Sequence, residues 1–286
     1  MKVAFLGTGL MGQPLAQRLL AAKVPVVVYN RTQSKLALLE EAGAKIALSP
    51  QDAIASCDCT ILMLSDASAI EQVLSSCSKQ HLQSRTIIQM GTISPSQSQA
   101  IGDRIVAAGG EYLEAPVLGS IPEAETGKLI VMVGASPAQF EKWLNLLQNF
   151  GPKPLLIGPV GTAAAMKLAL NQLIAALTNA FGLSLGFVQR QGVEVETFME
   201  ILRQSAIYAP TFDKKLARML DRNYANPNFP TKHLLKDTNL FLEEAKSSGL
   251  NAQSLEGVRE ILEIAQEMGL NEMDYSSLFD AVNPQS

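Results

Sequence analysis

Three glycines near the N-terminus constrain the fold of this chain more than any other feature. They belong to a G-x-G-x-x-G pattern formed by Gly7, Thr8, Gly9, Leu10, Met11 and Gly12. The pattern follows the apolar run Val3–Leu6 and opens a helical stretch, which is the context that a dinucleotide-binding turn requires. A helix that begins there offers backbone N–H groups to phosphate oxygens. The sequence therefore predicts a nucleotide site at residues 7–12, with an ordinary glycine turn as the alternative.

The first half of the chain alternates short apolar runs with amphipathic stretches. The apolar runs are Val3–Leu6, Val24–Tyr29, Ile46–Leu48, Thr60–Leu64, Thr86–Met90, Glu111–Glu114 and Leu129–Val133. Helical patterns occupy Leu10–Ala22, Gln33–Ala42, Ala67–Ser76, Pro95–Ala108 and Pro137–Phe150. Runs buried on both faces that alternate with helices predict an α/β domain with a doubly wound, mostly parallel Rossmann sheet.

The pattern changes after a stretch rich in glycine and proline at residues 151–161. Thr162–Gln191 reads as one long apolar helix that links two domains, and polar residues such as Lys167 and Asn171 argue against a membrane span. Shorter helical patterns follow at Val195–Ser205, Thr211–Arg222, Thr231–Ser248, Ala252–Met268 and Tyr275–Ala281. The sequence therefore predicts a Rossmann domain at residues 1–158 and an all-α domain at residues 159–286.

Composition excludes several classes of protein. The chain has 286 residues and a net charge of −4, so it lacks the basic surface of a nucleic-acid binder. Three cysteines and two histidines, none at metal-ligand spacing, predict neither a disulfide framework nor a metal site. We expect a cytoplasmic or organelle-stromal protein. Because the long helix is apolar around its circumference, we also expect a homodimer or homotetramer that covers it.

The residues after the second apolar run indicate which cofactor the chain prefers. Asn30, Arg31 and Thr32 lie about 18–20 residues after Gly12, where an NAD-specific site places an acidic residue. A carboxylate would repel a 2′-phosphate, whereas a guanidinium pairs with it. The sequence therefore favours NADP(H), with a solvated surface Arg31 as the alternative.

Two further apolar runs, Thr60–Leu64 and Thr86–Met90, are followed by small or polar residues. Leu64, Ser65 and Asp66 close one run, and Thr92 follows another. Ligands of open α/β sheets collect outside the carboxyl ends of the strands. These residues are therefore candidates to contact the ribose or the nicotinamide.

Lys167 and Asn171 stand out on the long helix. At i and i+4 they share one face of a segment that is otherwise apolar. A lysine on a largely buried helix needs a partner or a chemical role. The alternative is a lysine that extends along the helix to solvent.

The whole chain resembles the β-hydroxyacid dehydrogenase family, and within it the glyoxylate/succinic semialdehyde reductases. The resemblance rests on several motifs in the same order: Phe5–Gly12, Asn30–Thr32, Met63–Asp66, Glu114–Ser120 with Pro122, Ala124 and Gly127, then Gly161–Asn171, Phe229–His233 and Lys236–Asp237. It implies a reaction in which the nicotinamide transfers hydride to a small aldehyde or keto acid.

The resemblance also implies roles for individual residues. Lys167 matches the family's catalytic lysine, and Asn171 matches a residue that positions the substrate. Gly119 and Ser120 match a loop that receives the substrate carboxylate, while Thr92 and Lys236 match cofactor contacts. Phe229 and Asp237 match positions beside the active site. The family usually has serine where this chain has Leu118, so one hydroxyl donor to the carboxylate is missing and the identity of the substrate stays open.

Three other functions remain open on the same scaffold. A 3-hydroxyisobutyrate-type dehydrogenase would usually prefer NAD, which Arg31 argues against. An imine reductase would commonly lack a lysine such as Lys167. A non-catalytic NADP-binding sensor or scaffold would not need Lys167 together with Asn171.

Overall fold

A computed structural model describes residues 1–285 of the chain. The chain divides into two compact units, the first at Met1–Lys167 and the second from Leu168 onward. The division falls inside the long helix α9 (Thr162–Arg190), later than the position after Gly158 that the sequence suggested. Each unit is described by itself.

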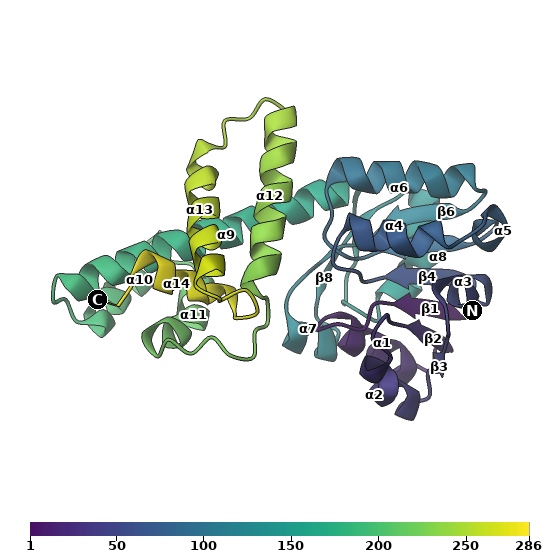
Figure 1. The fold of residues 1–286 in the computed structure, drawn as a ribbon, viewed down its shortest axis with the longest axis horizontal. Helices are drawn as coiled ribbons and strands as arrows, with labels where there is room; N and C mark the ends of the chain where they lie inside the picture. Colours follow the sequence, from purple (N-terminus) through teal and green to yellow (C-terminus); the bar gives the residue numbers. More distant parts are fainter. Residues whose placement is uncertain (286) are drawn as a thin grey trace. The chain divides into compact units, whose positions relative to one another are not determined.

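The first unit is built on a nine-stranded sheet with the order β3-β2-β1-β4-β5-β6-β8-β7, in which β9 also pairs with β8. Its strands are β1 (Val3–Leu6), β2 (Val26–Tyr29), β3 (Lys45–Ile46), β4 (Cys59–Leu62), β5 (Thr86–Gln89), β6 (Glu111–Glu114), β7 (Val117–Leu118), β8 (Ile130–Gly134) and β9 (Leu155–Gly158). The first six strands pair in parallel, whereas β8 runs antiparallel to β6 and β7. This is the Rossmann topology that the sequence predicted (Figure 1).

Helices cover both faces of the sheet because successive strand residues point to opposite faces. Val3 and Phe5 join the core beneath α1 (Gly12–Ala21), α2 (Ala37–Glu41) and α8 (Pro137–Leu147). Ala4 and Leu6 join a second core beneath α3 (Pro50–Ala55), α4 (Ala67–Ser75), α5 (Lys79–Leu82) and α6 (Pro95–Ala107). A short 3-10 turn at Gln33–Leu36 precedes α2.

The structure corrects the predicted elements at the margins of the sheet. The run Ile46–Leu48 was expected to be buried on both faces, but β3 keeps two exposed residues and Leu48 is 81% exposed. An edge strand needs only one paired neighbour and tolerates this exposure. Short elements that the apolar pattern did not reveal are β7, β9, α3, α5 and α7 (Ile121–Thr126).

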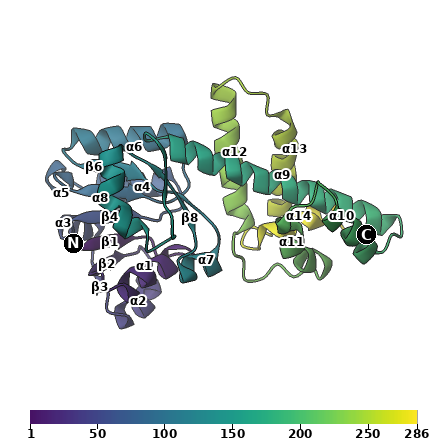
Figure 2. The same ribbon diagram turned by 180° about the vertical axis from the view of Figure 1, so that it is seen from behind.

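The second unit is helical. Its elements after α9 are α10 (Val195–Gln204), α11 (Pro210–Leu220), α12 (Thr231–Ser247), α13 (Gln253–Glu267), a 3-10 turn at Tyr275–Ser277 and α14 (Leu278–Val282). The helices α12 and α13 lie side by side in both views (Figure 1 and Figure 2). One core joins α9, α12 and α13 around Leu234 and Leu262, and a second joins α9, α10 and α11 around Phe181 and Phe212.

Helix α9 is unusually apolar for its length. By length and composition alone it could cross a membrane, and 39% of its most apolar window is buried within the described part of the chain. Its exposed apolar side chains include Leu173, Leu183 and Phe187. The absence of a membrane span therefore stays a prediction.

Candidate active site

The turn after β1 has the close packing that the glycine pattern predicts. A side chain on Gly12 would overlap the carbonyl oxygen of Gly7, so the helix start and the strand end touch through their backbones. Gly7 itself has a φ of 96°, a conformation that favours glycine. The turn therefore holds the N-terminus of α1 directly over the end of β1.

No side chain caps the N-terminus of α1. Its N-cap residue, Met11, makes no side-chain cap, and the first turn contains no acidic residue. The buried hydroxyl of Thr8 has no hydrogen-bond partner. Unpaired N–H groups at a helix start and an orphaned donor fit a bound phosphate. Gly7, Gly9, Leu10, Met11 and Gly12 can therefore hold the pyrophosphate of a dinucleotide.

Asn30 organises the loop after β2. Its side-chain oxygen accepts a hydrogen bond from the Thr8 N–H at 3.2 Å, and its amide donates to the Thr32 carbonyl at 2.9 Å. Arg31 lies exposed between these two anchored residues. The loop thus fixes the backbone on both sides of Arg31, beside the turn that carries Thr8.

The loops after β4 and β5 press against the same turn. A side chain on Gly7 would overlap the Met63 carbonyl and approach the Leu64 side chain, and one on Gly91 would overlap the Leu64 carbonyl. Leu64 therefore lies between the loop of Gly7 and the loop that continues to Thr92. The structure brings these predicted cofactor residues together at one edge of the sheet.

Asp66 also has a structural role that the sequence did not reveal. Its carboxylate caps α4 by accepting from the Ala69 N–H at 2.8 Å, and it accepts from the Ser65 hydroxyl at 2.7 Å. Both side chains are therefore engaged within their own loop, and their backbone groups remain the candidates for cofactor contact.

Glu114 joins the sheet to the start of α9. One carboxylate oxygen accepts from the backbone N–H groups of Gly161, Ala163 and Ala164 at 2.8, 2.8 and 3.1 Å. The other oxygen accepts from the Ser98 hydroxyl. The side chain is 1% exposed; burial raises the pKa of Glu114, and the hydrogen bonds oppose that shift. This buried carboxylate fixes the first turn of the helix that carries Lys167.

Lys167 and Asn171 occupy successive turns of α9. Lys167 is 9% exposed and Asn171 is 2% exposed. In the second unit the Asn171 amide nitrogen donates to Asp237 at 2.6 Å, while the side-chain oxygen of Asn171 is buried without a partner. A buried acceptor without a donor marks a place where a ligand hydroxyl or N–H would be favourable.

Asp237 is paired on both sides. One oxygen accepts from Asn171, and the other lies 2.9 Å from the ammonium group of Lys236. Asp237 is 2% exposed. A buried carboxylate needs partners within the protein, and Asn171 and Lys236 supply them. The structure thus brings together Asn171, Lys236 and Asp237, which the resemblance placed around substrate and cofactor.

Aromatic rings lie at the start of α12. Phe229 stacks on the His233 ring with centroids 6.4 Å apart and meets the Tyr275 ring edge-on at 5.8 Å. Burial lowers the pKa of His233, and the nearby Lys236 and Lys232 add to the effect. Sequence reasoning singled out Phe229 and missed His233 as its partner, although the i, i+4 spacing of the two residues was a usable signal.

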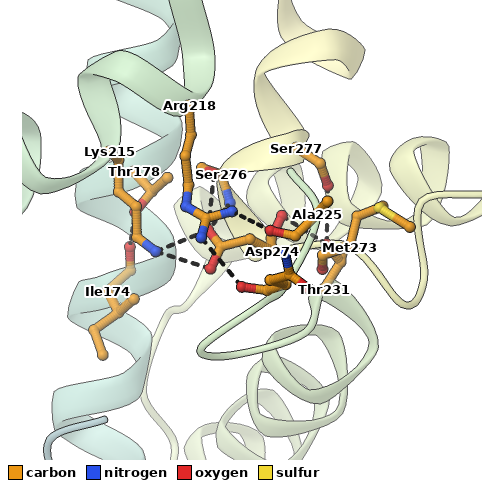
Figure 3. A network of polar contacts seen from close by, with 11 residues as sticks. Ile174, Thr178, Lys215, Arg218, Ala225, Thr231, Met273, Asp274, Ser276 and Ser277 are labelled. Atoms are coloured by element: carbon orange, nitrogen blue, oxygen red, sulfur yellow. Dashed lines mark hydrogen bonds and ion pairs between the residues drawn. The ribbon is translucent and has the colours of Figure 1, made fainter. Parts of the chain in front are cut away.

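A buried ion pair holds the segment that carries Phe229 (Figure 3). The Lys215 ammonium lies 2.8 and 3.0 Å from the two oxygens of Asp274, which is fully buried. Burial lowers the pKa of Lys215, and the Asp274 carboxylate opposes this shift. The backbone around Asp274 bonds to Thr231 and to the Phe229 carbonyl. The pair therefore anchors the entry to α12, and sequence reasoning missed it.

The turn of Leu118, Gly119 and Ser120 leads from β7 into α7. Leu118 is half-buried. Ser120 is the N-cap of α7, and its N–H and hydroxyl both donate to Glu123, at 2.8 and 2.7 Å. The two donors of Ser120, on the loop that the resemblance assigns to a substrate carboxylate, are therefore already bonded to a carboxylate of the chain.

Within residues 1–285, no three residues among histidine, cysteine, aspartate and glutamate lie close enough together to hold a metal ion.

Models of two protein families match the chain, one for each part. The NAD-binding domain of 6-phosphogluconate dehydrogenase matches residues 2–158. The NAD-binding domain of NADP-dependent 3-hydroxyisobutyrate dehydrogenase matches residues 161–282. Together they cover the nucleotide turn, the Glu114 anchor and the helices that carry Lys167 and Asp237.

Individual proteins match over the whole chain. Glyoxylate/succinic semialdehyde reductase 1 of Arabidopsis thaliana is 33% identical over 99% of this chain and 98% of its own. The 2-hydroxy-3-oxopropionate reductase of Escherichia coli is 30% identical over 99% of this chain and 97% of its own. A structure of Mycobacterium tuberculosis 3-hydroxyisobutyrate dehydrogenase with L-serine superimposes with a TM-score of 0.89 at 19% identity, over 98% of each chain.

With a Rossmann sheet, a helical second unit and these full-length matches, the chain belongs to the β-hydroxyacid dehydrogenase family. It is an NAD(P)-dependent oxidoreductase that acts on CH–OH groups.

Proposed function

We propose that this protein uses NADPH to reduce a small aldehyde or keto acid to the corresponding hydroxy compound. The observation that carries the proposal is the nearly buried Lys167, held on a helix whose first turn Glu114 anchors, one turn before Asn171. The relatives named for glyoxylate, succinic semialdehyde and 2-hydroxy-3-oxopropionate reduction support this class of reaction.

Lys167 acts as the general acid in this proposal. When bound, the nicotinamide supplies the hydride to the carbonyl carbon. The Lys167 ammonium donates a hydrogen bond to the carbonyl oxygen, stabilises the negative charge that develops there, and transfers its proton. In the oxidative direction the neutral amine accepts the hydroxyl proton. Asn171 and Asp237 fix the polar groups of the substrate, and Phe229 supplies an apolar wall.

NADP(H) is the proposed cofactor, with Arg31 as the residue that selects it. The loop after β2 has no acidic residue to bind a ribose 2′-hydroxyl, and Asn30 anchors the backbone around an exposed guanidinium. An exposed guanidinium at this position favours a 2′-phosphate through charge-assisted, two-pronged hydrogen bonds. Thr92 and Lys236 are the further proposed cofactor contacts.

An NADPH-oxidation screen tests the proposal. Wild-type protein and Lys167→Ala are compared over aldehydes and keto acids of two to five carbons and over a cyclic imine, with NADH in parallel. We expect turnover that prefers NADPH and that falls steeply in the variant. Tight NADPH binding without turnover of any carbonyl would instead identify a non-catalytic NADP-binding protein, and turnover of cyclic imines alone would identify an imine reductase.

We also propose that the protein works as a homodimer or homotetramer. The exposed apolar side chains of α9, among them Leu173, Leu183 and Phe187, support a partner subunit on this helix. Light scattering at micromolar concentration tests the proposal, since a monomeric mass would contradict it.

A further inference from the structure

The buried carboxylate of Glu114 is bound by uncharged hydrogen-bond donors. One oxygen accepts from the backbone N–H groups of Gly161, Ala163 and Ala164, and the other accepts from the Ser98 hydroxyl. Three N–H donors on one oxygen favour the ionised form of a carboxyl group, because hydrogen bonds to the charged form stabilise it. The negative charge of Glu114 is therefore held at the N-terminus of α9.

Lys167 lies near the same end of α9. It is the sixth residue of the helix, about 4.5 Å along the axis beyond Ala164. Side chains of an α-helix lean toward its N-terminus, which carries a partial positive charge that disfavours an ammonium group. Lys167 is also only 9% exposed, and burial disfavours the charged form of a lysine. An ammonium at this position therefore needs a nearby negative charge.

We propose that Glu114 is a positioning residue whose negative charge keeps Lys167 in the ammonium form that the reduction requires. The inference rests on the proposed function and deepens it, because it explains how a nearly buried lysine can serve as the acid. Glu114 acts through the first turn of α9. Its carboxylate offsets the positive end of the helix, and its hydrogen bonds fix the backbone that carries Lys167.

The other charged groups near this stretch of α9 belong to α12. Helix α9 itself carries no charged residue besides Lys167 before its last position. On α12, Asp237 and Lys236 form an ion pair, and Asp237 accepts from Asn171, one turn beyond Lys167. This pair adds no net charge. Glu114 therefore supplies the net negative charge at the start of α9.

The strand β6 offers a matched pair of substitutions. Glu114→Gln keeps an oxygen that can accept from the three N–H groups and removes the negative charge. Glu111 lies on the same strand, where its half-exposed carboxylate pairs with Lys142 at 2.7 Å. Glu111→Gln therefore makes the same change of net charge without touching the start of α9.

The measurement is the pH profile of kcat/KM for reduction of succinic semialdehyde with NADPH. We expect wild-type values to stay level up to about pH 9 and to fall above it, since lysine ordinarily loses its proton near pH 10.4. In Glu114→Gln the fall should move down by about one pH unit, because an opposite charge is lost in a partly buried place. In Glu111→Gln it should move by less than about 0.3 unit, as expected for an exposed charge.

Two results would overturn the inference. A rate in Glu114→Gln that is lower at every pH, with the fall at its wild-type position, would show that Glu114 has a purely structural role. A wild-type fall near pH 7 would show that Lys167 is not held as an ammonium. This second result does not depend on how well the variant folds.

A direct titration separates this inference from the proposed function. Absence of turnover with every carbonyl at every pH would overturn the proposed function. The titration of Lys167 is then followed by NMR of protein labelled with carbon-13 at the lysine ε-carbons, and the signal missing from Lys167→Ala gives the assignment. A Lys167 signal that titrates at lower pH in Glu114→Gln than in wild type supports the role of Glu114, and coincident titrations overturn it.

Discussion

The N-termini of two helices in the sheet unit, α1 and α7, differ in whether their hydrogen-bond donors are available to an anion. The first turn of α1 contains no acidic residue, and its N-cap residue, Met11, makes no side-chain cap. The first turn of α7 contains Glu123, which accepts both donors of its N-cap residue, Ser120. The same backbone feature, a helix N-terminus after a glycine turn, is open in α1 and closed in α7.

The difference teaches that a helix N-terminus is a binding site only when the chain leaves its donors unused. Open N–H groups cost stability in the free protein and regain it when a phosphate binds. A capping box satisfies the donors with the chain's own side chains, so the free protein is stabilised but the donors are no longer available to a ligand. In this protein the nucleotide turn before α1 leaves its donors open, whereas the turn before α7 has a capping box.

If the open turn of α1 serves binding alone, removing the proposed acid should leave the binding of NADPH unaffected. Lys167→Ala should lower kcat by on the order of 10²–10⁴, the usual contribution of a general acid. The Kd for NADPH and the thermal stability should remain close to wild type. Steady-state kinetics and fluorescence titration check this, and wild-type turnover in the variant would refute the role of Lys167.

An acidic side chain at the open turn before α1 should abolish tight binding of NADPH. Gly9→Asp places a carboxylate at the start of α1, where a side chain on Gly9 meets no atom within 4 Å, so the fold should tolerate it. Repulsion of the pyrophosphate should raise the Kd for NADPH by about 10² or more. Calorimetry gives the affinity and a melting curve gives the control. Unaltered affinity would mean that phosphate does not bind at this turn.

The cofactor loop beside the open turn should discriminate between nucleotides. Arg31→Ala should weaken NADPH binding by roughly 1.5–3 kcal/mol, about one to two decades in Kd, because a charge-assisted contact to the 2′-phosphate is lost. Affinity for NADH should barely change. Parallel titrations with both cofactors test this, and equal losses would show that Arg31 does not contact the 2′-phosphate.

Adding a donor to the closed turn should have the smallest effect. Leu118→Ser supplies the hydroxyl that the family usually has and should shift the ratio of kcat/KM for glyoxylate to that for succinic semialdehyde by about tenfold towards glyoxylate. Wild type should favour the longer substrate, since a methylene packed on Leu118 contributes about 0.8 kcal/mol. An unaltered ratio would place residue 118 away from the substrate.

The sequence predicted the parts of this molecule whose signals are local. The G-x-G-x-x-G pattern and the buried strands β1, β4 and β5 could be read directly, because each depends on neighbouring residues. The strands β7 and β3 have two residues each, too few for a periodic pattern. The capping box of Ser120 and Glu123 was visible as S-x-x-E and was overlooked.

Long-range polar contacts could not be read in the same way. Glu114 lies in a run that resembles an ordinary strand end, and its backbone N–H partners begin 47 residues later, at Gly161. Lys215 and Asp274 are 59 residues apart, on elements with no shared pattern. Only the packing of the chain reveals that each charge is buried and needs the other group.

The hydrogen bonds of Glu114 to the start of α9 determine where a stable fragment of the sheet unit can end. The model of the first family ends at residue 158, a natural place to cut. A fragment ending there would retain the buried carboxylate and lose all three N–H donors of Gly161, Ala163 and Ala164. Loss of the partners of a buried charge costs about 3–5 kcal/mol, a large share of the stability of a domain. The sheet unit therefore ends as a folding unit within α9, and a fragment that stops at Lys167 keeps the donors that its own glutamate requires.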